Sequence, residues 1–556
     1  MADTMKGLKR THYCGTVTPE MIGREVVVCG WAQKTRDMGT LVFIDLRDRT
    51  GIVQLAFDDK TDPALLAKAQ KVRAEYVLMA RGVLRQRESV NHEIPTGEVE
   101  VYVTELRVLA ESNTPPFAIS DDSRGVKEDL RLKYRYLDLR RPEMQNAIAM
   151  RHRIVKIARD YYDTNGFYEI ETPMLTKSTP EGARDYLVPS RVHPGKFYAL
   201  PQAPQQFKQL LMTSGFDRYF QIAPCFRDED ARADRSPGEF YQLDMEMAFA
   251  TQDDIFAVLE DVLPPIFAKF GTYNVASSAA PFRRIPYNTA METYGSDKPD
   301  LRIDLTCKNV SELFVASEFE AFKGQTVKMV PISDCALTRK QVEKLLTDCE
   351  VQSGSKAYWF KVDEKGELAG GIAKFVAPVE AELGKIIDLK PGTLVLAAAG
   401  QYATKSVGVL IKTFGAACEN HFDKERYEFC WIVDFPMYEI GDESGELEFC
   451  HNPFSMPNGG MEVLLKAERG EIDPLTITAD QYDLVCNGVE LSSGAVRNHD
   501  PEIMIKAFEL VRLGEEDVKA KFPAMYNAFC YGAPPHAGIA PGVDRMVMLL
   551  AGEDSI

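Results

Sequence analysis

The sequence predicts a multidomain α+β protein, and three observations lead to this fold class. Its 556 residues correspond to three to four domains at about 150 residues each. The first 115 residues are rich in β patterns, interrupted by a single helical stretch at residues 62–74. Farther along, helical and strand patterns are mixed, and residues 240–249 alternate cleanly between polar and apolar side chains.

The N-terminal region has the pattern of a small β-barrel. Turn residues or short polar stretches separate its β-rich runs, which are residues 24–33, 40–47, 51–58, 76–87 and 98–109. Pro63 begins the helical stretch between the third and fourth runs, as is typical of a first helical turn. Five strands with a helix at this position favour an OB-type barrel, a fold that often binds nucleic acid.

Composition is that of a globular protein and excludes several classes. The hydrophobic fraction is 45%, and no stretch approaches the roughly 18 uncharged apolar residues of a membrane span. Residues 1–15 have no apolar core, so we expect neither a signal peptide nor a transit peptide. The eleven cysteines include no C-x-x-C pair, which argues against a disulfide framework or a structural zinc site. We therefore expect a cytoplasmic protein that does not associate with membranes.

Net charge at first argues against a nucleic-acid partner. Lys and Arg total 65 against 83 for Asp and Glu, a net charge of −18, whereas phosphate binding rests on basic surface. The charge is unevenly distributed along the chain. Residues 1–115 carry 16 basic and 16 acidic side chains, whereas residues 121–160 carry 11 basic and 7 acidic ones. The acidity lies elsewhere, so the total says little about local surface.

Residues 240–249 predict a strand with one buried and one polar face, the polar positions being Gln242, Asp244 and Glu246. Residues 218–229 form the expected partner strand, with Arg227 and Glu229 on a shared face. An antiparallel hairpin would therefore place arginine beside carboxylates. Spacing alone slightly favours a solvated sheet face with surface ion pairs.

Two C-terminal segments shift that balance toward a functional site. A glycine-rich strand leads into an apolar helix near Val543, and Arg545 falls in its first turn, where an anion can bind. Upstream, Asp483 and Glu490 flank a turn at Asn487-Gly488. Two such carboxylates can hold a divalent cation against phosphates.

Five segments together resemble the class II aminoacyl-tRNA synthetases, and within them the bacterial-type aspartyl-tRNA synthetases of subclass b. They are residues 132–142, 162–175 (similar to motif 1), 178–186, 226–240 (similar to motif 2) and 538–545 (similar to motif 3). The resemblance covers essentially the whole chain, although related chains continue beyond the position of Ile556 and the sequence leaves open whether this chain is truncated.

The resemblance implies a domain organisation. An OB-fold anticodon-binding domain (1–115) and a hinge (116–140) would precede an antiparallel-sheet catalytic domain in two parts, 141–290 and 429–556. Between these parts, residues 291–428 would form an inserted α/β domain, in which we find no constellation attached to chemistry.

For ATP, the resemblance implies binding by motifs 2 and 3. Arg227 would contact the α-phosphate and the amino acid's carboxylate, and Arg545 the γ-phosphate. Glu490 would join these two as the third catalytic residue and would hold Mg²⁺ with Asp483. The ATP-binding residues implied are Arg227, Asp228, Glu229, Phe240, Gln242, Glu490, Gly542 and Arg545, with Phe240 stacked on adenine.

For the amino acid, the resemblance implies L-aspartate. Lys208 and Arg497 would meet its side-chain carboxylate. The remaining contacts implied are Gln205 and Asp244 on the ammonium group, Glu181 in a loop that closes over the substrate, and His451. A buried Arg–Lys pair favours a carboxylate over the nearly isosteric amide of asparagine, because the amide would leave two charges uncompensated.

On the barrel, the resemblance implies anticodon binding, with Phe43 stacked on a base and Arg36, Gln54 and Glu100 at base edges. The alternative for Phe43 is a core position, because Leu41, Phe43 and Asp45 share a face of mixed character.

The activity implied is ATP- and Mg²⁺-dependent transfer of aspartate to tRNA-Asp by a homodimer, with tRNA-Asn as an open second substrate. An asparaginyl- or lysyl-tRNA synthetase is one alternative, against which the pair Lys208 and Arg497 argues. A non-catalytic tRNA-binding relative is another. Departures from the family pattern are Ala203 where many relatives carry Ser, Asn452 where some carry His, and Gly238 as an extra residue.

Overall fold

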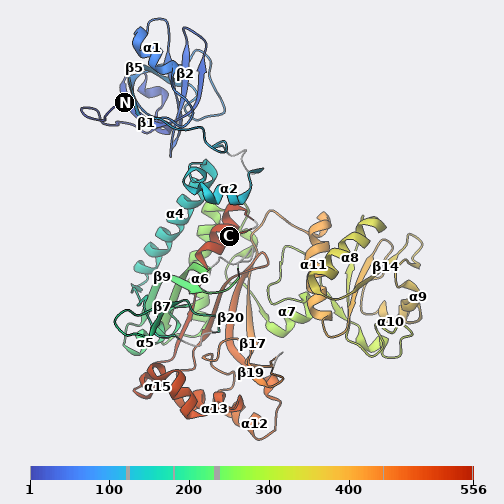
Figure 1. Ribbon diagram of the computed structural model, residues 1–556. Helices are drawn as coiled ribbons and strands as arrows, with labels where there is room; N and C mark the ends of the chain where they lie inside the picture. The colour runs from blue at the N-terminus through green and yellow to red at the C-terminus, as the bar shows by residue number, and fades with distance from the viewer. Residues whose placement is uncertain (1, 121–124, 179–181, 231–237, 442–443, 554) are drawn as a thin grey trace. The chain divides into compact units, whose positions relative to one another are not determined.

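The computed structural model describes residues 2–120, 125–178, 182–230, 238–441, 444–553 and 555–556. The chain divides into two units, Met1–Met150 and Arg151–Ile556 (Figure 1). Within the described ranges, no helix has the length and apolar character needed to cross a lipid bilayer.

Five strands close into a barrel in the N-terminal unit, in the order β1-β2-β3-β5-β4. They are β1 (Glu25–Asp37), β2 (Val42–Asp48), β3 (Gly51–Phe57), β4 (Val77–Gln86) and β5 (Val99–Ala110). Alternate side chains point inward, as in β2, where Val42, Ile44 and Leu46 are fully buried. The closed barrel confirms the architecture predicted from the β-rich runs.

Helix α1 (Pro63–Gln70) lies between β3 and β4 as predicted, but it ends earlier than residue 74. Asp62 caps its start by accepting hydrogen bonds from two amides of the first turn. At the other end, the amide of Val72 bonds the carbonyl of Ala69, three residues back. Glu75 then adopts a left-handed φ of 63°. This tightened turn stops the helix.

Three helices follow the barrel: α2 (Glu128–Lys133), α3 (Arg135–Asp138) and α4 (Pro142–Thr164). Asp138 is fully buried and accepts hydrogen bonds from Arg135 and Arg141. Arg140 pairs with Glu75 at 3.0 Å. The Arg140–Glu75 pair ties the end of the hinge to the segment between α1 and β4, within the N-terminal unit.

An eight-stranded sheet forms the core of the second unit, in the order β11-β17-β20-β21-β22-β10-β9-β6. Its strands are β6 (Tyr168–Glu169), β9 (Arg218–Arg227), β10 (Gly238–Ala248), β11 (Arg283–Pro286), β17 (Phe429–Pro436), β20 (Thr478–Cys486), β21 (Val489–Val496) and β22 (His536–Ile539). The central pairs are antiparallel as predicted, whereas β6–β9 and β11–β17 are parallel. The sheet is therefore mixed, because long connections return the chain in the same direction at both edges.

Helices and short hairpins surround this sheet. The helices are α5 (Gln205–Thr213), α6 (Gln252–Phe270), α7 (Tyr287–Tyr294), α12 (Gly460–Glu468), α13 (Pro501–Leu510), α14 (Glu515–Lys521), α15 (Pro523–Cys530) and α16 (Val543–Ala551). The hairpin strands are β7 (Leu187–Pro189), β8 (Phe197–Ala199), β18 (Tyr438–Ile440) and β19 (Leu447–Phe449). Of these helices, α5 and α16 matter most here, because they carry side chains into the site described below.

A second sheet, β12-β13-β16-β14-β15, lies between β11 and β17 in sequence. Its strands are β12 (Lys308–Asn309), β13 (Val327–Ile332), β14 (Ala357–Val362), β15 (Leu368–Ala369) and β16 (Leu394–Ala399), and its helices α8 (Arg339–Ser353), α9 (Ala373–Val376), α10 (Glu380–Leu383) and α11 (Ala403–Ala417). Leu394 and Leu396 pack with α8 and α11, whereas Val395 and Ala397 pack with α9 and α10. Burial on both faces explains why β16 is apolar throughout.

Candidate active site

A cavity of about 440 Å³ opens on the eight-stranded sheet of the second unit. The structure brings most of the predicted amino-acid and ATP residues together around it: Gln205, Lys208, Arg227, Glu229, Phe240, Gln242, Asp244, His451, Asp483, Glu490, Arg497, Gly542 and Arg545. Asp228 does not line the cavity, because it is exposed after β9 and its backbone bonds Arg184. Glu181 lies outside the described residues.

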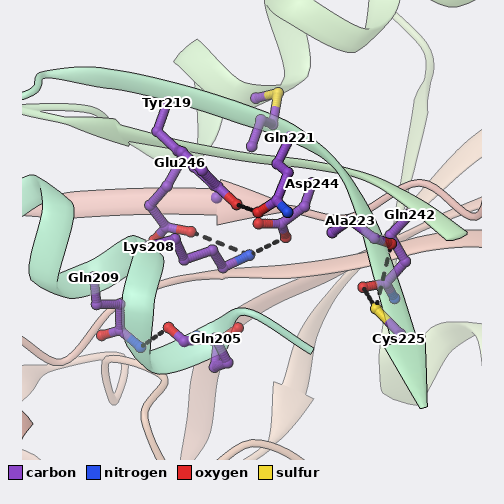
Figure 2. A network of polar contacts seen from close by, with 12 residues as sticks. Gln205, Lys208, Gln209, Tyr219, Gln221, Ala223, Cys225, Gln242, Asp244 and Glu246 are labelled. Carbon is purple, nitrogen blue, oxygen red and sulfur yellow. Dashed lines mark hydrogen bonds and ion pairs between the residues drawn. The ribbon is translucent and has the colours of Figure 1, made fainter. Parts of the chain in front are cut away.

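Four buried charges form one cluster beside the cavity, and three of them, Lys208, Asp244 and Arg497, line it. Lys208 of α5 donates to Asp244 at 2.7 Å and lies 3.3 Å from Glu246, both on β10 (Figure 2). Arg497, which follows β21, donates to Glu246 from Nε at 2.8 Å and from Nη2 at 3.1 Å. We call Lys208, Asp244, Glu246 and Arg497 the buried quartet. Its two positive and two negative charges balance.

Burial of Asp244 and Glu246 overturns the interpretation of β10 as a solvated face. Their side chains are 1% and 0% exposed. Burial raises the pKa of Asp244, a shift that Lys208 opposes. Burial also acts to raise the pKa of Glu246, but Arg497 and Lys208 outweigh it and hold that pKa below its ordinary value. Glu246 is therefore ionised at neutral pH.

The specificity argument from sequence is corrected by these contacts. Lys208 and Arg497 would not be left uncompensated beside an amide, because Asp244 and Glu246 already pair with them. The numbers of hydrogen-bond donors and acceptors give these side chains a different physical basis for preferring a carboxylate to an amide. Glu246 accepts hydrogen bonds from Nε and Nη2 of Arg497 but not from Nη1. Lysine and arginine only donate, so a carboxylate satisfies them at both oxygens, whereas the amide nitrogen of asparagine would meet cationic donors.

The opposite side of the cavity is built on the hairpin β20–β21. Asn487 and Gly488 form its two-residue turn, with φ values of 53° and 77°. The turn brings Asp483 and Glu490 onto neighbouring strands, where burial, followed by the Glu490 charge, raises the pKa of Asp483 well above its ordinary value. We call Lys298, Asp483, Glu490 and Arg545 the open quartet.

Two cations bracket Glu490. Arg545 Nη1 lies 3.4 Å from Oε1 of Glu490, and Lys298 Nζ lies 3.3 Å from Oε2. Arg545 Nη1 also donates to the backbone carbonyl of Glu490 at 2.6 Å. Burial lowers the pKa of Lys298, but Glu490 and Asp297 outweigh it and raise that pKa above its ordinary value. The ammonium is therefore charged at neutral pH.

Aromatic and backbone groups lie between the two quartets. The guanidinium carbon of Arg227 is 5.0 Å from the centre of the Phe240 ring. Gln242 bridges to Gly542 in sheet-like pairing, which holds the start of α16 against β10. Burial lowers the pKa of His451, which is therefore neutral at physiological pH.

Several buried polar atoms around the cavity have no hydrogen-bond partner among the residues that the structure describes. They are Gln205 Nε2, Arg227 Nε, Asp244 Oδ2, Asp483 Oδ1 and Ser492 Oγ. Unpaired buried groups are costly, so their gathering at one cavity is typical of a site that a polar ligand completes.

A divalent cation fits Asp483 and Glu490. Asp483 offers an unpartnered carboxylate oxygen, and Mg²⁺ typically takes one or two carboxylates plus phosphate oxygens. The described part of the chain contains no group of three or more His, Cys, Asp or Glu side chains that could hold a metal. A cation here would thus depend on phosphate oxygens for the rest of its ligands.

Sequence reasoning left several residues at the site unassigned, among them three charged ones, Glu246, Asp297 and Lys298. Glu246 was visible in the alternation of β10, but its link to Arg497 spans 251 positions and needs the fold. Asp297 and Lys298 line the cavity although they belong to the range predicted as the insertion. The short charged sequence Asp297-Lys-Pro-Asp300 was the available signal.

The predicted anticodon residues share one face of the barrel. Arg36 donates to Gln54 at 2.8 Å, and Gln54 donates to Glu100 at 2.6 Å. Phe43 pairs with Arg36 across β1–β2 and lies partly exposed outside the barrel core. The alternative of a core position for Phe43 is therefore wrong.

Two family models match the chain. One describes an OB-fold nucleic acid binding domain and covers residues 26–109, and the other describes tRNA synthetases class II (D, K and N) and covers residues 127–556. The aspartate–tRNA ligase of Streptomyces coelicolor is 50% identical over 98% of this chain and 92% of its own length. The aspartate–tRNA(Asp/Asn) ligase of Rickettsia bellii is 49% identical over 98% of this chain and 91% of its own length.

Solved structures show the same fold at lower identity. Asparaginyl-tRNA synthetase from Pyrococcus horikoshii, complexed with asparaginyl-adenylate, gives a TM-score of 0.61 at 17% identity, covering 98% of this chain and 96% of its own. Aspartyl tRNA synthetase from Entamoeba histolytica gives a TM-score of 0.59 at 21% sequence identity. The match covers 99% of this chain and 90% of that one.

Proposed function

The chain belongs to the class II tRNA synthetases (D, K and N), and we propose that it activates L-aspartate with ATP and attaches it to tRNA-Asp. The observation that carries the proposal is the buried quartet, in which Lys208 and Arg497 line the cavity together. Relatives at 49 and 50% identity, named as aspartate ligases, support it.

Each charge of L-aspartate has a partner of opposite sign around the cavity. Arg497 Nη1 and Lys208 would bind the side-chain carboxylate. Asp244 Oδ2, which lacks a partner among the described residues, would accept from the ammonium group. Arg227 would bind the α-carboxylate and the α-phosphate of ATP. Asparagine and lysine offer no side-chain anion, which argues against both as substrates.

Activation then needs positioning and charge stabilisation rather than a base. The α-carboxylate is already ionised, so one of its oxygens attacks the α-phosphorus directly while the bond to pyrophosphate breaks. Arg227 and Arg545 would stabilise the charge that develops on the phosphates. A Mg²⁺ ion held by Asp483 and Glu490 would neutralise further phosphate charge when bound. Aspartyl-adenylate and pyrophosphate are the products.

In the second step, the hydroxyl of the 3′-terminal adenosine of tRNA takes the aspartyl group and AMP leaves. The barrel would hold the anticodon, with Phe43 as a stacking platform and Arg36, Gln54 and Glu100 at base edges.

Stacking contributes about 1–3 kcal/mol per base. Phe43→Ala should therefore raise the KM for tRNA by roughly 5- to 100-fold and leave aspartate-dependent ATP–pyrophosphate exchange unchanged.

Amino-acid-dependent ATP–pyrophosphate exchange tests the activity directly. We expect exchange with aspartate and none above background with asparagine or lysine. Exchange driven by asparagine or lysine would instead support the corresponding synthetase, and no exchange with any of the three would support a non-catalytic tRNA-binding protein.

The tRNA substrate is tested by charging purified tRNA-Asp and tRNA-Asn. We propose tRNA-Asp as the substrate. Because named relatives include tRNA(Asp/Asn) ligases, charging of tRNA-Asn at a comparable rate would extend the substrate to both tRNAs. The expected location is the cytoplasm, where both tRNAs and the ribosome are found.

Exposed apolar side chains support a homodimer. Tyr168, Leu175, Leu187, Phe197 and Phe249 are 64, 54, 56, 58 and 74% exposed, and the first two lie in the segment similar to motif 1. Large exposed apolar side chains are typical of an interface. Sedimentation equilibrium should give twice the mass of the chain, and Leu175→Asp should shift it toward the monomer.

A further inference from the structure

Lys298 is a cavity-lining cation to which the mechanism above gives no role. It follows α7, and its ammonium contacts two carboxylates, Asp297 Oδ2 at 2.6 Å and Glu490 Oε2 at 3.3 Å. Its side chain is 36% exposed. A lysine that is neither buried nor solvated freely, and that faces a ligand cavity, needs an explanation other than packing.

The backbone beside Lys298 is fixed against the hairpin that carries Asp483 and Glu490. The amide of Lys298 donates to Ser296 Oγ at 3.0 Å. Asp300 accepts three hydrogen bonds from Arg302, one from its backbone amide at 3.1 Å and two from its guanidinium at 2.9 and 2.7 Å. It also packs on the turn glycine Gly488, where an added Cβ would lie 3.2 Å from Asp300 Cβ. These contacts fix the backbone at Lys298, while its ammonium group lies at the cavity.

The contact between Lys298 and Glu490 conflicts with the role proposed for Glu490. A divalent cation bound by this carboxylate would lie close to an ammonium 3.3 Å from the same oxygen, and like charges repel strongly at that distance. Lysine has a flexible four-carbon stem and three donors, so its head can move to another anion. The anions that enter with the metal are the phosphate oxygens of ATP.

We propose that Lys298 binds the β- and γ-phosphates of ATP, exchanging Glu490 for phosphate oxygens when the nucleotide enters. Asp297 would remain its second partner and keep the head at the cavity. Lys298 would then stabilise the pyrophosphate leaving group from the side opposite Arg545. This inference rests on the proposed activation of aspartate by ATP.

Direct binding without metal tests the inference. Isothermal titration in EDTA would compare wild-type, Lys298→Met and Lys298→Arg chains, using the methylene analogue of ATP (AMPPCP) and AMP as probes. Lys298→Met should weaken AMPPCP binding by about 10- to 100-fold, the value of a charge-assisted hydrogen bond, and leave AMP unchanged. Lys298→Arg should recover most of the loss. Lys323→Met, an exposed lysine paired with Glu320, is the matched control and should change neither probe.

Exchange kinetics supply an independent readout. Lys298→Met should raise the KM for ATP and for pyrophosphate and leave the KM for aspartate within about twofold. Equal weakening of AMPPCP and AMP, or AMPPCP bound as tightly as by wild type, would overturn the assignment. Failure of the proposed function is distinct, because it would appear as no aspartate-dependent exchange by the wild-type chain.

Discussion

The buried quartet and the open quartet contain the same charges in different surroundings. Lys208, Asp244, Glu246 and Arg497 are at most 2% exposed, and three of their hydrogen bonds measure 2.7 to 3.1 Å. In the open quartet, Lys298, Glu490 and Arg545 are 22 to 36% exposed, and their ion pairs measure 3.3 and 3.4 Å. Asp483 alone is deeply buried there.

We infer from this difference that the buried quartet is suited to selecting a substrate and the open quartet to rearranging when a ligand binds. Removing one partner of a buried ion pair leaves a charge without water or counter-charge, so the geometry of the buried quartet is strongly enforced. Such a fixed set suits discrimination between two nearly isosteric amino acids. Partly solvated pairs cost less to break than buried ones. We therefore expect the open quartet to rearrange more readily than the buried quartet when a ligand binds.

The largest expected effect comes from breaking the buried quartet at Arg497. Arg497→Leu removes the bidentate partner of Glu246 and the donor that we propose for the substrate carboxylate. Loss of a buried charged partner for a bound anion costs about 2–5 kcal/mol of binding free energy, which predicts a fall of roughly 30- to 10³-fold or more in kcat/KM for aspartate. The affinity for ATP should change by less than about twofold, as measured by equilibrium binding.

A second variant controls for misfolding. The double change Arg497→Leu, Glu246→Leu removes both charges and should recover thermal stability, because no unpaired buried charge remains. It should remain inactive with aspartate. Normal aspartate activation by Arg497→Leu would contradict the specificity argument.

In the open quartet, Glu490→Gln should lower kcat for exchange by about 10²-fold, since one charge-stabilising group is typically worth that much. The Mg²⁺ concentration for half-maximal rate should rise, and the KM for aspartate should stay within about twofold. Glu382→Gln, which alters an exposed glutamate paired with Lys385, is the control. An unchanged Mg²⁺ dependence would argue against Glu490 as a metal ligand.

Salt should separate the two quartets without a mutation. Raising ionic strength from about 0.05 to 0.5 M shortens the range of exposed charge interactions and leaves buried pairs largely unscreened. We expect the KM for ATP to rise several-fold and the KM for aspartate to change by less than about twofold. An equal rise in both would contradict the contrast between the quartets.

The smallest effect concerns a carboxylate outside both quartets. Burial, with Asp434 and Asp253 nearby, raises the pKa of Asp480 on β20 from 3.8 to about 6. Its contribution to stability is therefore present below pH 3.8 and lost as pH rises through about 6. Asp480→Asn should raise the free energy of unfolding by on the order of 1 kcal/mol at pH 7.5. The gain should shrink toward pH 5, as urea unfolding at both values would measure.

Local pattern predicted much of the architecture. β-rich runs bounded by turn residues located the five barrel strands, alternation located β10, and Pro63 marked the start of α1. The parallel edges of the large sheet could not be read from pattern, because strand direction depends on which distant segments pair. The early end of α1 likewise follows from Glu75, whose left-handed backbone is stabilised by its buried pair with Arg47.

For the site, sequence motifs supplied the residue types, and the fold supplied their relations. Asp228 occupies a motif position but is exposed and does not line the cavity. Asp297 and Lys298 carry no family motif that we identified, yet they reach the cavity because Asp300 packs on the β20–β21 turn.

The sequence by itself determined the barrel, the hairpin of β9 and β10, the family resemblance and most, but not all, of the charged side chains around the cavity. These are local properties of periodicity, turn chemistry and motif spacing. Only the tertiary structure decided how those charges divide. Burial and pairing arise from contacts as far apart in sequence as Glu246 and Arg497. Such contacts bury one quartet and leave three side chains of the other partly exposed.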